Sequence, residues 1–307
     1  MKSEAELKFF FSTKLRPALE PMEQYRIEKV RKIKNNLYTA LPCSLFVVLG
    51  IISGQPGLIL FFCFPLAYFL GLAFQKFLKM STPLTKHFKN QILPELLSFL
   101  FDDYGYVANQ KIAKSVLEKS MLFPNYIAIV RGEDYMQFKL GATKIMFCET
   151  EVLVSREHVI FRGIFISASF NKSFTSKTFV LPSKVSSFYH NIKKQLLNNF
   201  HRVKLEDTEF SKEFLVLSTD QVEARYILTP GLMQRLLDYK RKTKKGISFS
   251  FVDNHLYCAI PNYINLFEPA IFEPFDFDFI KRNYNPLKLY TDLVEDLNLN
   301  LRIWSKQ

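Results

Sequence analysis

The stretch YTALPCSLFVVLGIISGQPGLILFFCFPLAYFLGLAF, residues 38–74, sets the architecture of this chain because it contains no charged residue. A single membrane span needs about 20 apolar residues, so the stretch is long enough for two short ones. Turn-forming residues in SGQPG, at 53–57, divide it into two arms. We therefore predict a transmembrane helical hairpin with arms Tyr38–Ser53 and Leu58–Phe74. The alternative, a buried helical pair in a soluble protein, is disfavoured by so long an uncharged run.

Basic residues are concentrated around this apolar stretch. Residues 1–90 carry 13 Lys and Arg against 5 Asp and Glu, out of 41 and 29 in the whole chain, whose formal charge is +12. A nucleic-acid-binding domain would instead interleave basic and aromatic residues on a folded surface, so we expect the lipid bilayer, and no nucleic acid, as a partner. The positive-inside rule predicts anchoring in the inner (cytoplasmic) membrane, with both termini and the soluble domain in the cytoplasm. A cleavable signal peptide is not expected, because the apolar run begins late.

Four segments follow from these patterns. We predict a basic amphipathic helical segment at 1–37, a two-span transmembrane hairpin at 38–75, a helical segment at 76–125 and an α+β cytoplasmic domain at 126–307. Two interpretations of the first segment stay open. Such a helix lies on anionic lipid, or it packs as an ordinary helix next to the membrane, which we slightly prefer.

From residue 126 the apolar period changes from helical to alternating, which is typical of strands. A sheet interleaved irregularly with helices is an α+β fold, and we expect the sheet to be mostly antiparallel. Predicted strand segments are YIAIVRG (126–132), DYMQFKLGATKIMFCETEVLVS (134–155), EHVIFRGIFISASF (157–170), SKTFVLPS (176–183) and EFLVLS (213–218), and GISFSFVDNHLYCAI (246–260) is a predicted hairpin. Further helices are expected at 185–200 and 286–300.

The stretch STDQVEARYILTPGLMQRLLDY, residues 218–239, has two interpretations. As a strand, its first half would place alternate apolar residues on one face. As a helix, it would use Asp220 as the N-cap and Glu223 as the N3 partner, the spacing of a capping box. We favour a short helix, followed by a second that begins at Thr229-Pro230. Arg225 is then either an ion-pair anchor in the fold, which we prefer, or a ligand-binding group.

Known catalytic motifs are missing from the sequence. There is no P-loop, dinucleotide fingerprint, G-x-S-x-G or H-E-x-x-H. The four cysteines form no C-x-x-C pair, which excludes a disulfide framework and indicates a reducing compartment. The five histidines are scattered, and the acidic run EPFDFDF, 273–279, is more typical of an exposed loop than of a metal site. We therefore expect no metal, no cofactor and no catalytic residue.

Several separated motifs resemble a bacterial domain-of-unknown-function family, numbered 3137. They are GEDY (132–135), KIMFCETEV (144–152), FRGIFISASFNKSF (161–174), LEDTEFSKEFLVLSTDQVEARYILTPGLMQRL (205–236) and LNLRIWSK (299–306). The similarity covers roughly residues 95–306 and the preceding hairpin. It implies an uncharacterised bacterial protein with one or two N-terminal spans, and it supplies no catalytic residue.

Two function hypotheses follow. The first is a membrane-anchored cytoplasmic module that binds a protein or lipid partner. The alternative is an enzyme acting on a membrane-associated or small-molecule substrate through a pocket in the α+β domain, and the absence of a catalytic motif disfavours it. The candidate binding residues are Arg225, Glu149 and Asp220. A transporter or channel would need intramembrane ionisable groups or assembly as a homo-oligomer.

Overall fold

The computed structural model describes residues 2–124, 126–141, 143–169, 175–183, 196, 200–244, 246–253, 255–263 and 265–302. It confirms the α+β class, with two long apolar helices followed by an antiparallel sheet of nine strands. The chain divides into two compact units. Lys2–Leu96 with Phe267–Asn285 form the hairpin unit, and Leu97–Leu266 with the residues from Pro286 onward form the sheet unit.

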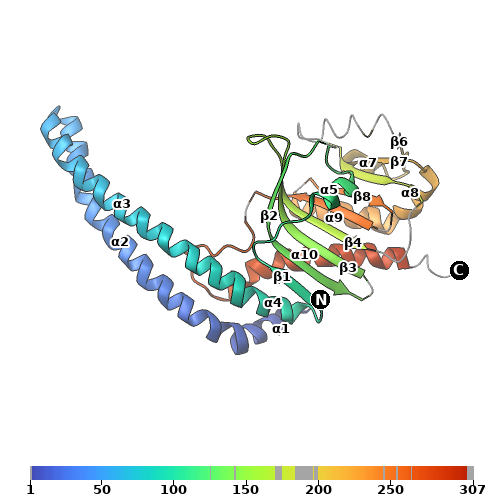
Figure 1. Cartoon of the computed structure of the whole chain (residues 1–307), viewed down its shortest axis with the longest axis horizontal. Coiled ribbons are helices and arrows are strands. Elements are labelled where there is room, and N and C mark those ends of the chain that lie inside the picture. Colours follow the sequence, from blue (N-terminus) through green and yellow to red (C-terminus); the bar gives the residue numbers. More distant parts are fainter. Residues whose placement is uncertain are drawn as a thin grey trace. The chain divides into compact units, whose positions relative to one another are not determined.

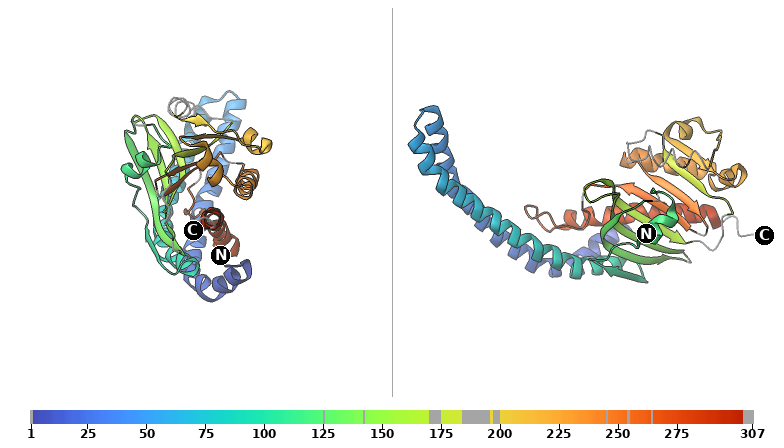
Figure 2. Two further views of the ribbon diagram at one scale, coloured as in Figure 1. Left: turned by 90° about the vertical axis from the view of Figure 1, so that its right-hand side faces the viewer. Right: turned by 45° about the horizontal axis from the view of Figure 1, so that its top comes forward.

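The hairpin unit is built on two helices that lie side by side, α2 (Arg16–Ile52) and α3 (Pro56–His87) (Figure 1, Figure 2). The turn between them falls where the sequence predicted it, with Gly54 at a φ of 65°. Both helices are long and apolar enough to cross a membrane. In the regions of highest hydropathy, only 11% and 6% of the residues are buried. The basic N-terminal segment from Arg16 onward and the first arm form one continuous helix, α2. Pro42 lies inside this helix, and an interior proline can bend a helix without ending it.

An ion pair between the buried Arg26 and the half-buried Glu23 lies at the base of the hairpin. The Arg26 guanidinium contacts the Glu23 carboxylate at 2.6 Å and donates to the carbonyl oxygen of Ile271 at 3.2 Å. The Glu23 carboxylate also accepts the Phe275 amide at 3.0 Å. These contacts hold the segment 271–275 on α2. The ends of the unit are completed by α1 (Glu4–Phe10) and α4 (Leu93–Leu100), each joined to its long helix by a π-helical turn, Phe11–Leu15 and Phe88–Ile92.

Two parts of the chain differ from the helices and loops that the sequence predicted. The segment 76–125 is not entirely helical, because β1 (Tyr104–Val107) follows the helix-breaking Asp102-Asp103 and precedes α5 (Lys114–Ser120). The run 273–279 is only partly a loop, since the Asp276 carboxylate accepts the Phe279 amide at 3.0 Å and begins α10 (Phe277–Arg302). Two of its three phenylalanines are packed in the core, Phe275 at 5% and Phe279 at 3% exposure, and Phe277 is half-buried.

The sheet has the strand order β1-β2-β3-β4-β9-β8-β5-β7-β6, and every neighbouring pair is antiparallel. Its strands after β1 are β2 (Ile129–Leu140), β3 (Thr143–Leu153), β4 (Val159–Ser169), β5 (Thr178–Pro182), β6 (His201–Arg202), β7 (Phe214–Ser218), β8 (Ser248–Val252) and β9 (His255–Pro261).

Most predicted strands are confirmed, including the β8–β9 hairpin around Asp253. The two strands expected at 126–132 and 134–155 are divided differently. β2 continues through a bulge between Glu133 and Met136, and the chain then turns at Gly141. The helix predicted at 185–200 lies outside the described residues, apart from Leu196 and Phe200.

Alternation along β3 assigns its residues to the two faces of the sheet. Cys148 and Val152 face a buried core that α5 helps to cover. Phe147 faces the opposite way, and its ring lies 5.8 Å from that of Tyr290 on α10. The remaining helices of the sheet unit are α7 (Thr208–Glu213), α8 (Gln221–Ile227) and α9 (Pro230–Thr243). The short helix α8 and its successor α9 confirm the preferred interpretation of residues 218–239, with Thr229 as the N-cap of α9.

Candidate functional site

A polar pocket of about 400 Å³ lies in the sheet unit, over one end of β2, β3 and β4. Charged and amide side chains dominate its lining. They are Asn109, Arg131, Glu133, Glu149, Glu151, Arg162, Asn262 and Asn265. We call this cavity the polar pocket.

Strand register arranges the charges of the polar pocket in two rows. Arg131, Glu151 and Arg162 are direct partners on β2, β3 and β4, so their side chains share one face in the order positive, negative, positive. Arg131 and Glu151 form an ion pair at 3.2 Å. In the neighbouring row on the same face, Glu133 lies opposite Glu149. Two carboxylates directly opposite one another repel, which makes this row a centre of negative charge.

The backbone between these rows is unusually close-packed. Gly132 and Gly163 flank Thr150 on either side of β3. A β-carbon at Gly132 would lie 2.5 Å from the carbonyl oxygen of Glu149, and one at Gly163 would lie 2.1 Å from that of Ile260. A side chain at either position would therefore displace backbone, between β2 and β3 at Gly132 and between β4 and β9 at Gly163.

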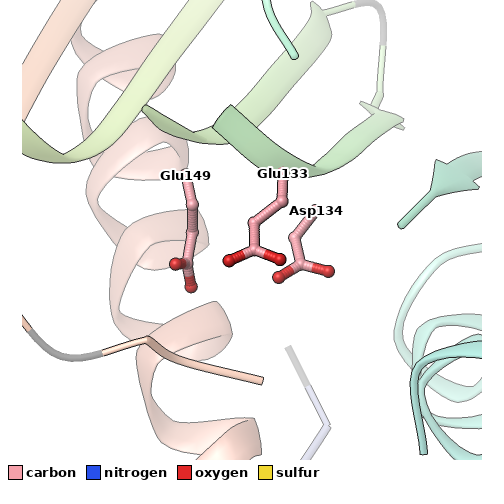
Figure 3. Close-up of side chains that lie close together, drawn as sticks. All are labelled: Glu133, Asp134 and Glu149. Atoms are coloured by element: carbon pink, nitrogen blue, oxygen red, sulfur yellow. The ribbon is translucent and has the colours of Figure 1, made fainter. Parts of the chain in front are cut away.

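A third carboxylate joins the acidic row at the bulge of β2. The carboxylate oxygens of Glu133, Asp134 and Glu149 lie within 4.8 Å of one another, and Figure 3 shows the three side chains extending in the same direction from the strands. Asp134 is 1% exposed and has a φ of 55°, while its amide donates to the Ala108 carbonyl oxygen at 2.8 Å. The bulge therefore turns the Asp134 side chain to the acidic row, which regular alternation would not do.

Neighbouring groups orient two of the three carboxylates, those of Asp134 and Glu149. The Tyr106 hydroxyl donates to Asp134 at 2.6 Å, and the Leu266 amide donates to Glu149 at 2.7 Å. Burial, reinforced by the charge of Asp134, raises the pKa of Tyr106, so its hydroxyl stays protonated and remains a donor. Behind the row, burial raises the pKa of the Cys148 thiol to about 11, which keeps it out of thiolate chemistry at neutral pH.

The donor set of this cluster defines what it can bind. Carboxylate oxygens suit hard divalent cations such as Mg²⁺, Ca²⁺ and Mn²⁺ rather than thiolate-preferring metals. They also suit a protonated amine or a guanidinium, which would offset their mutual repulsion. Glu133 and Asp134 were not among the binding residues predicted from the sequence. The signal was available in the acidic pair of GED (132–134), which a hairpin places opposite ETE (149–151).

Of the three binding candidates from the sequence, only Glu149 lines the polar pocket. Asp220 is the N-cap of α8, where its carboxylate accepts the amides of Val222 at 2.7 Å and Glu223 at 3.2 Å. Arg225 donates to the carbonyl oxygen of Lys204 at 3.3 Å and to Gln221 at 3.4 Å. Both residues therefore have contacts within the fold, but in the described parts of the chain Arg225 bonds a carbonyl oxygen and an amide rather than the acidic partner expected for it.

Glu223 differs from the capping-box expectation. Its carboxylate accepts the amides of Thr175 at 3.1 Å and Ser176 at 2.5 Å, and the Thr175 hydroxyl at 2.9 Å. Burial alone would raise the pKa of Glu223, but these hydrogen bonds outweigh it and hold the pKa below its usual value. The acid binds a loop distant in sequence because that loop presents three donors at the start of α8.

Comparison with known proteins confirms the family resemblance over residues 159–299. They match the family model described as "Protein of unknown function (DUF3137)". No curated protein matches the chain. Among solved structures, the crystal structure of the mycobacterial trehalose monomycolate transport factor A, TtfA, is similar at 8% identity and a TM-score of 0.33, over 63% of this chain and 88% of that chain.

Proposed function

We propose that this protein is a membrane-anchored module whose sheet unit lies on the cytoplasmic side of the inner membrane and binds a protein partner in the polar pocket. The exposed apolar surface of the hairpin carries the proposal. Ile52 and Phe64 are each 77% exposed, and Phe61 is 73% exposed. Burying one such side chain is worth roughly 1.5–3 kcal/mol, so this surface belongs in a bilayer rather than in water.

Basic residues at the open end of the hairpin support the orientation. Lys34 and Lys76 flank the apolar stretch, whereas its turn at 53–57 has no Lys or Arg. The Lys76 ammonium donates to the Asn36 side chain at 3.2 Å, which joins the two helices where the apolar surface ends. Positive charge on this side favours retention in the cytoplasm.

The charge arrangement of the polar pocket favours a protein partner that presents a Lys or Arg side chain. The pocket-lining carboxylates of Glu133 and Glu149, with the buried Asp134 carboxylate within 4.8 Å, attract a cationic group. The Arg131–Glu151–Arg162 row beside them would pair with acidic neighbours of that group. Such alternation of charge gives specificity, because a partner with the wrong charge order meets like charges.

Two experiments test these claims separately. A reporter fused after Gln307 is expected to stay cytoplasmic, and its export would overturn the topology. A photo-crosslinking amino acid at Asn262, in the full chain in cells, is expected to give a protein adduct that Glu149→Gln abolishes. The same amino acid at the exposed Lys212, outside the pocket, is the matched control. Adducts of equal yield from both positions, or no adduct at Asn262, would contradict binding in the pocket.

The proximity of the three carboxylates also favours the alternative, an enzyme that uses a divalent cation on a membrane-associated or small-molecule substrate. Tb³⁺ is a luminescent substitute for Ca²⁺ and Mg²⁺. If the alternative holds, the full chain should sensitise Tb³⁺ luminescence, and Mg²⁺ or Ca²⁺ should displace the bound Tb³⁺. Glu133→Gln should lower the affinity for Tb³⁺ at least tenfold. The protein-partner proposal predicts no saturable Tb³⁺ site.

A further inference from the structure

The sheet unit has a second concave surface, a groove of about 1300 Å³. Pockets that enclose small ligands span about 300–1,000 Å³, so this groove has room for an elongated molecule. It lies on the opposite face of the sheet from the polar pocket. Lys144 and Met146 line it, and alternation along the unbroken β3–β4 register directs them away from the side of Glu149 and Glu151. The two sites are therefore separate, one on each face of the sheet.

One end of the groove is basic. Lys139, Lys144, Ser169 and His255 form a row across β2, β3, β4 and β9. Burial lowers the pKa of His255, the charge of Asp253 opposes this, and Lys119 of α5, which also lines the groove, lowers the pKa further. Lys139 is paired with Asp103. Lys119 and Lys144 form no ion pair with any acidic residue in the described parts of the chain.

The groove becomes apolar along the strands. The next row across the sheet is mixed, with Met146 and Tyr257 beside the uncharged polar Gln137 and Ser167. Beyond it, Val116 of α5 and Tyr135 of β2 are partly buried and pack against the edge of the core. The helix α5 forms this wall, and its last residue, Ser120, accepts a hydrogen bond from Ser250 of β8 at 2.6 Å (Figure 1). Along the strands that form its floor, the groove thus becomes less polar from the row of Lys144 to the core edge, while Lys111 and Lys114 line it near Val116 and are held by the Val130 carbonyl oxygen and Glu118.

From this gradient we propose that the groove binds an anionic amphiphile. Its phosphate or carboxylate head would lie between Lys119 and Lys144, and its hydrocarbon tail would extend over Met146 toward Val116. Charge complementarity supports an anion, because five lysines and two aspartates line the groove. An acidic peptide fits less well, since it carries charge along its length and would place some of it on the apolar wall, where desolvation is costly.

The proposal can be tested on the full chain in nanodiscs of zwitterionic phosphatidylcholine. The probe is a single-chain alkyl phosphate with a photoreactive group in its tail, and labelled peptides are located by mass spectrometry. We expect adducts at peptides that contain Met146 or Val116. Unlabelled dodecyl phosphate should compete, whereas dodecyl maltoside, with the same tail and a neutral head, should not.

Charge-reversal variants provide the decisive comparison. Lys119→Glu combined with Lys144→Glu should lower groove labelling roughly 5- to 10-fold, because two attractive charges become repulsive. Lys212→Glu, the same change at an exposed lysine outside the groove, should leave it unchanged. Circular dichroism on each variant verifies folding. Three results would overturn the proposal: labelling confined to the hairpin, equal labelling of the double variant, or equal competition by inorganic phosphate or a polyglutamate peptide.

Discussion

Replacing Gly163 with alanine should destabilise the sheet unit, because the added methyl group would overlap the backbone of β9. Built on the existing backbone, the new β-carbon lies 2.1 Å from the Ile260 carbonyl oxygen, 2.7 Å from the Asn262 nitrogen and 2.9 Å from the Pro261 α-carbon. All three are main-chain atoms, so no side chain can rotate to make room. The two strands must separate where they carry one edge of the polar pocket.

The expected magnitude follows from two contributions. Overpacking a tight site costs about 1–3 kcal/mol. Separating the strands also weakens the hydrogen bond from the Asn262 amide to the Arg162 carbonyl oxygen, which spans 3.0 Å and contributes about 1 kcal/mol. The sum is roughly 2–4 kcal/mol. In a domain of about 150–250 residues, each 1 kcal/mol lowers Tm by about 2–4 °C, so we expect a decrease on the order of 5–15 °C.

Thermal unfolding of the full chain in mild detergent, followed by near-ultraviolet circular dichroism, measures this decrease. Gly105→Ala is the matched control, because a β-carbon at this strand position meets no atom within 4 Å. Its Tm should stay the same or rise slightly. A Tm for Gly163→Ala within about 1 °C of the parent, or an equal decrease in both variants, would refute the steric reasoning.

Three further predictions concern contacts elsewhere. Because the pKa of Glu223 is lowered in the folded state, its contribution to stability is complete above the unfolded pKa of about 4.3 and is lost as the pH falls through the folded pKa. Between pH 6 and 3, the free energy of unfolding should therefore fall less steeply in Glu223→Gln than in the parent. Parallel slopes would contradict this. Arg26→Ala should cost roughly 2–4 kcal/mol and open the segment 271–275 to proteolysis, because it removes a buried partner of Glu23. Lys32→Ala, at an exposed ion pair, should cost under about 1 kcal/mol. Equal protease resistance of the two variants would contradict the role of Arg26 in holding this segment on α2. Tyr106→Phe should cost about 1–3 kcal/mol in chemical denaturation, since it removes the hydroxyl that donates to the buried Asp134 at 2.6 Å, and an unchanged midpoint would argue against that hydrogen bond.

Local patterns predicted much of the fold because their causes are local. The turn at 53–57, the capping of α8 by Asp220 and the start of α9 at Thr229-Pro230 each depend on a few neighbouring residues. Alternating apolar residues likewise predicted the strands. The strand β1 was missed because its four residues form it only by pairing with β2, which lies about 30 residues later.

The candidate site was predicted only in part, because it depends on register. Glu149 was identified, but its closeness to Glu133 results from a pairing between β2 and β3 that composition does not reveal. Asp134 joins them through a bulge and a positive φ, neither of which the spacing of charges predicts. Glu223 was assigned to its own helix because a capping box is a local pattern, whereas its partners lie about 48 residues earlier.

The strand order has a consequence for synthesis of the chain. β1 to β4 can pair as soon as they leave the ribosome. The open edge of β4 is completed only by β9, so the backbone of Ile164 stays unpaired until its partner Ile260 has been synthesised. Until then the growing chain presents a row of unpaired backbone groups, a template for pairing with other chains. We expect premature termination anywhere between residues 170 and 254 to yield aggregation-prone products, so quality control of this protein should act chiefly on nascent chains of that length.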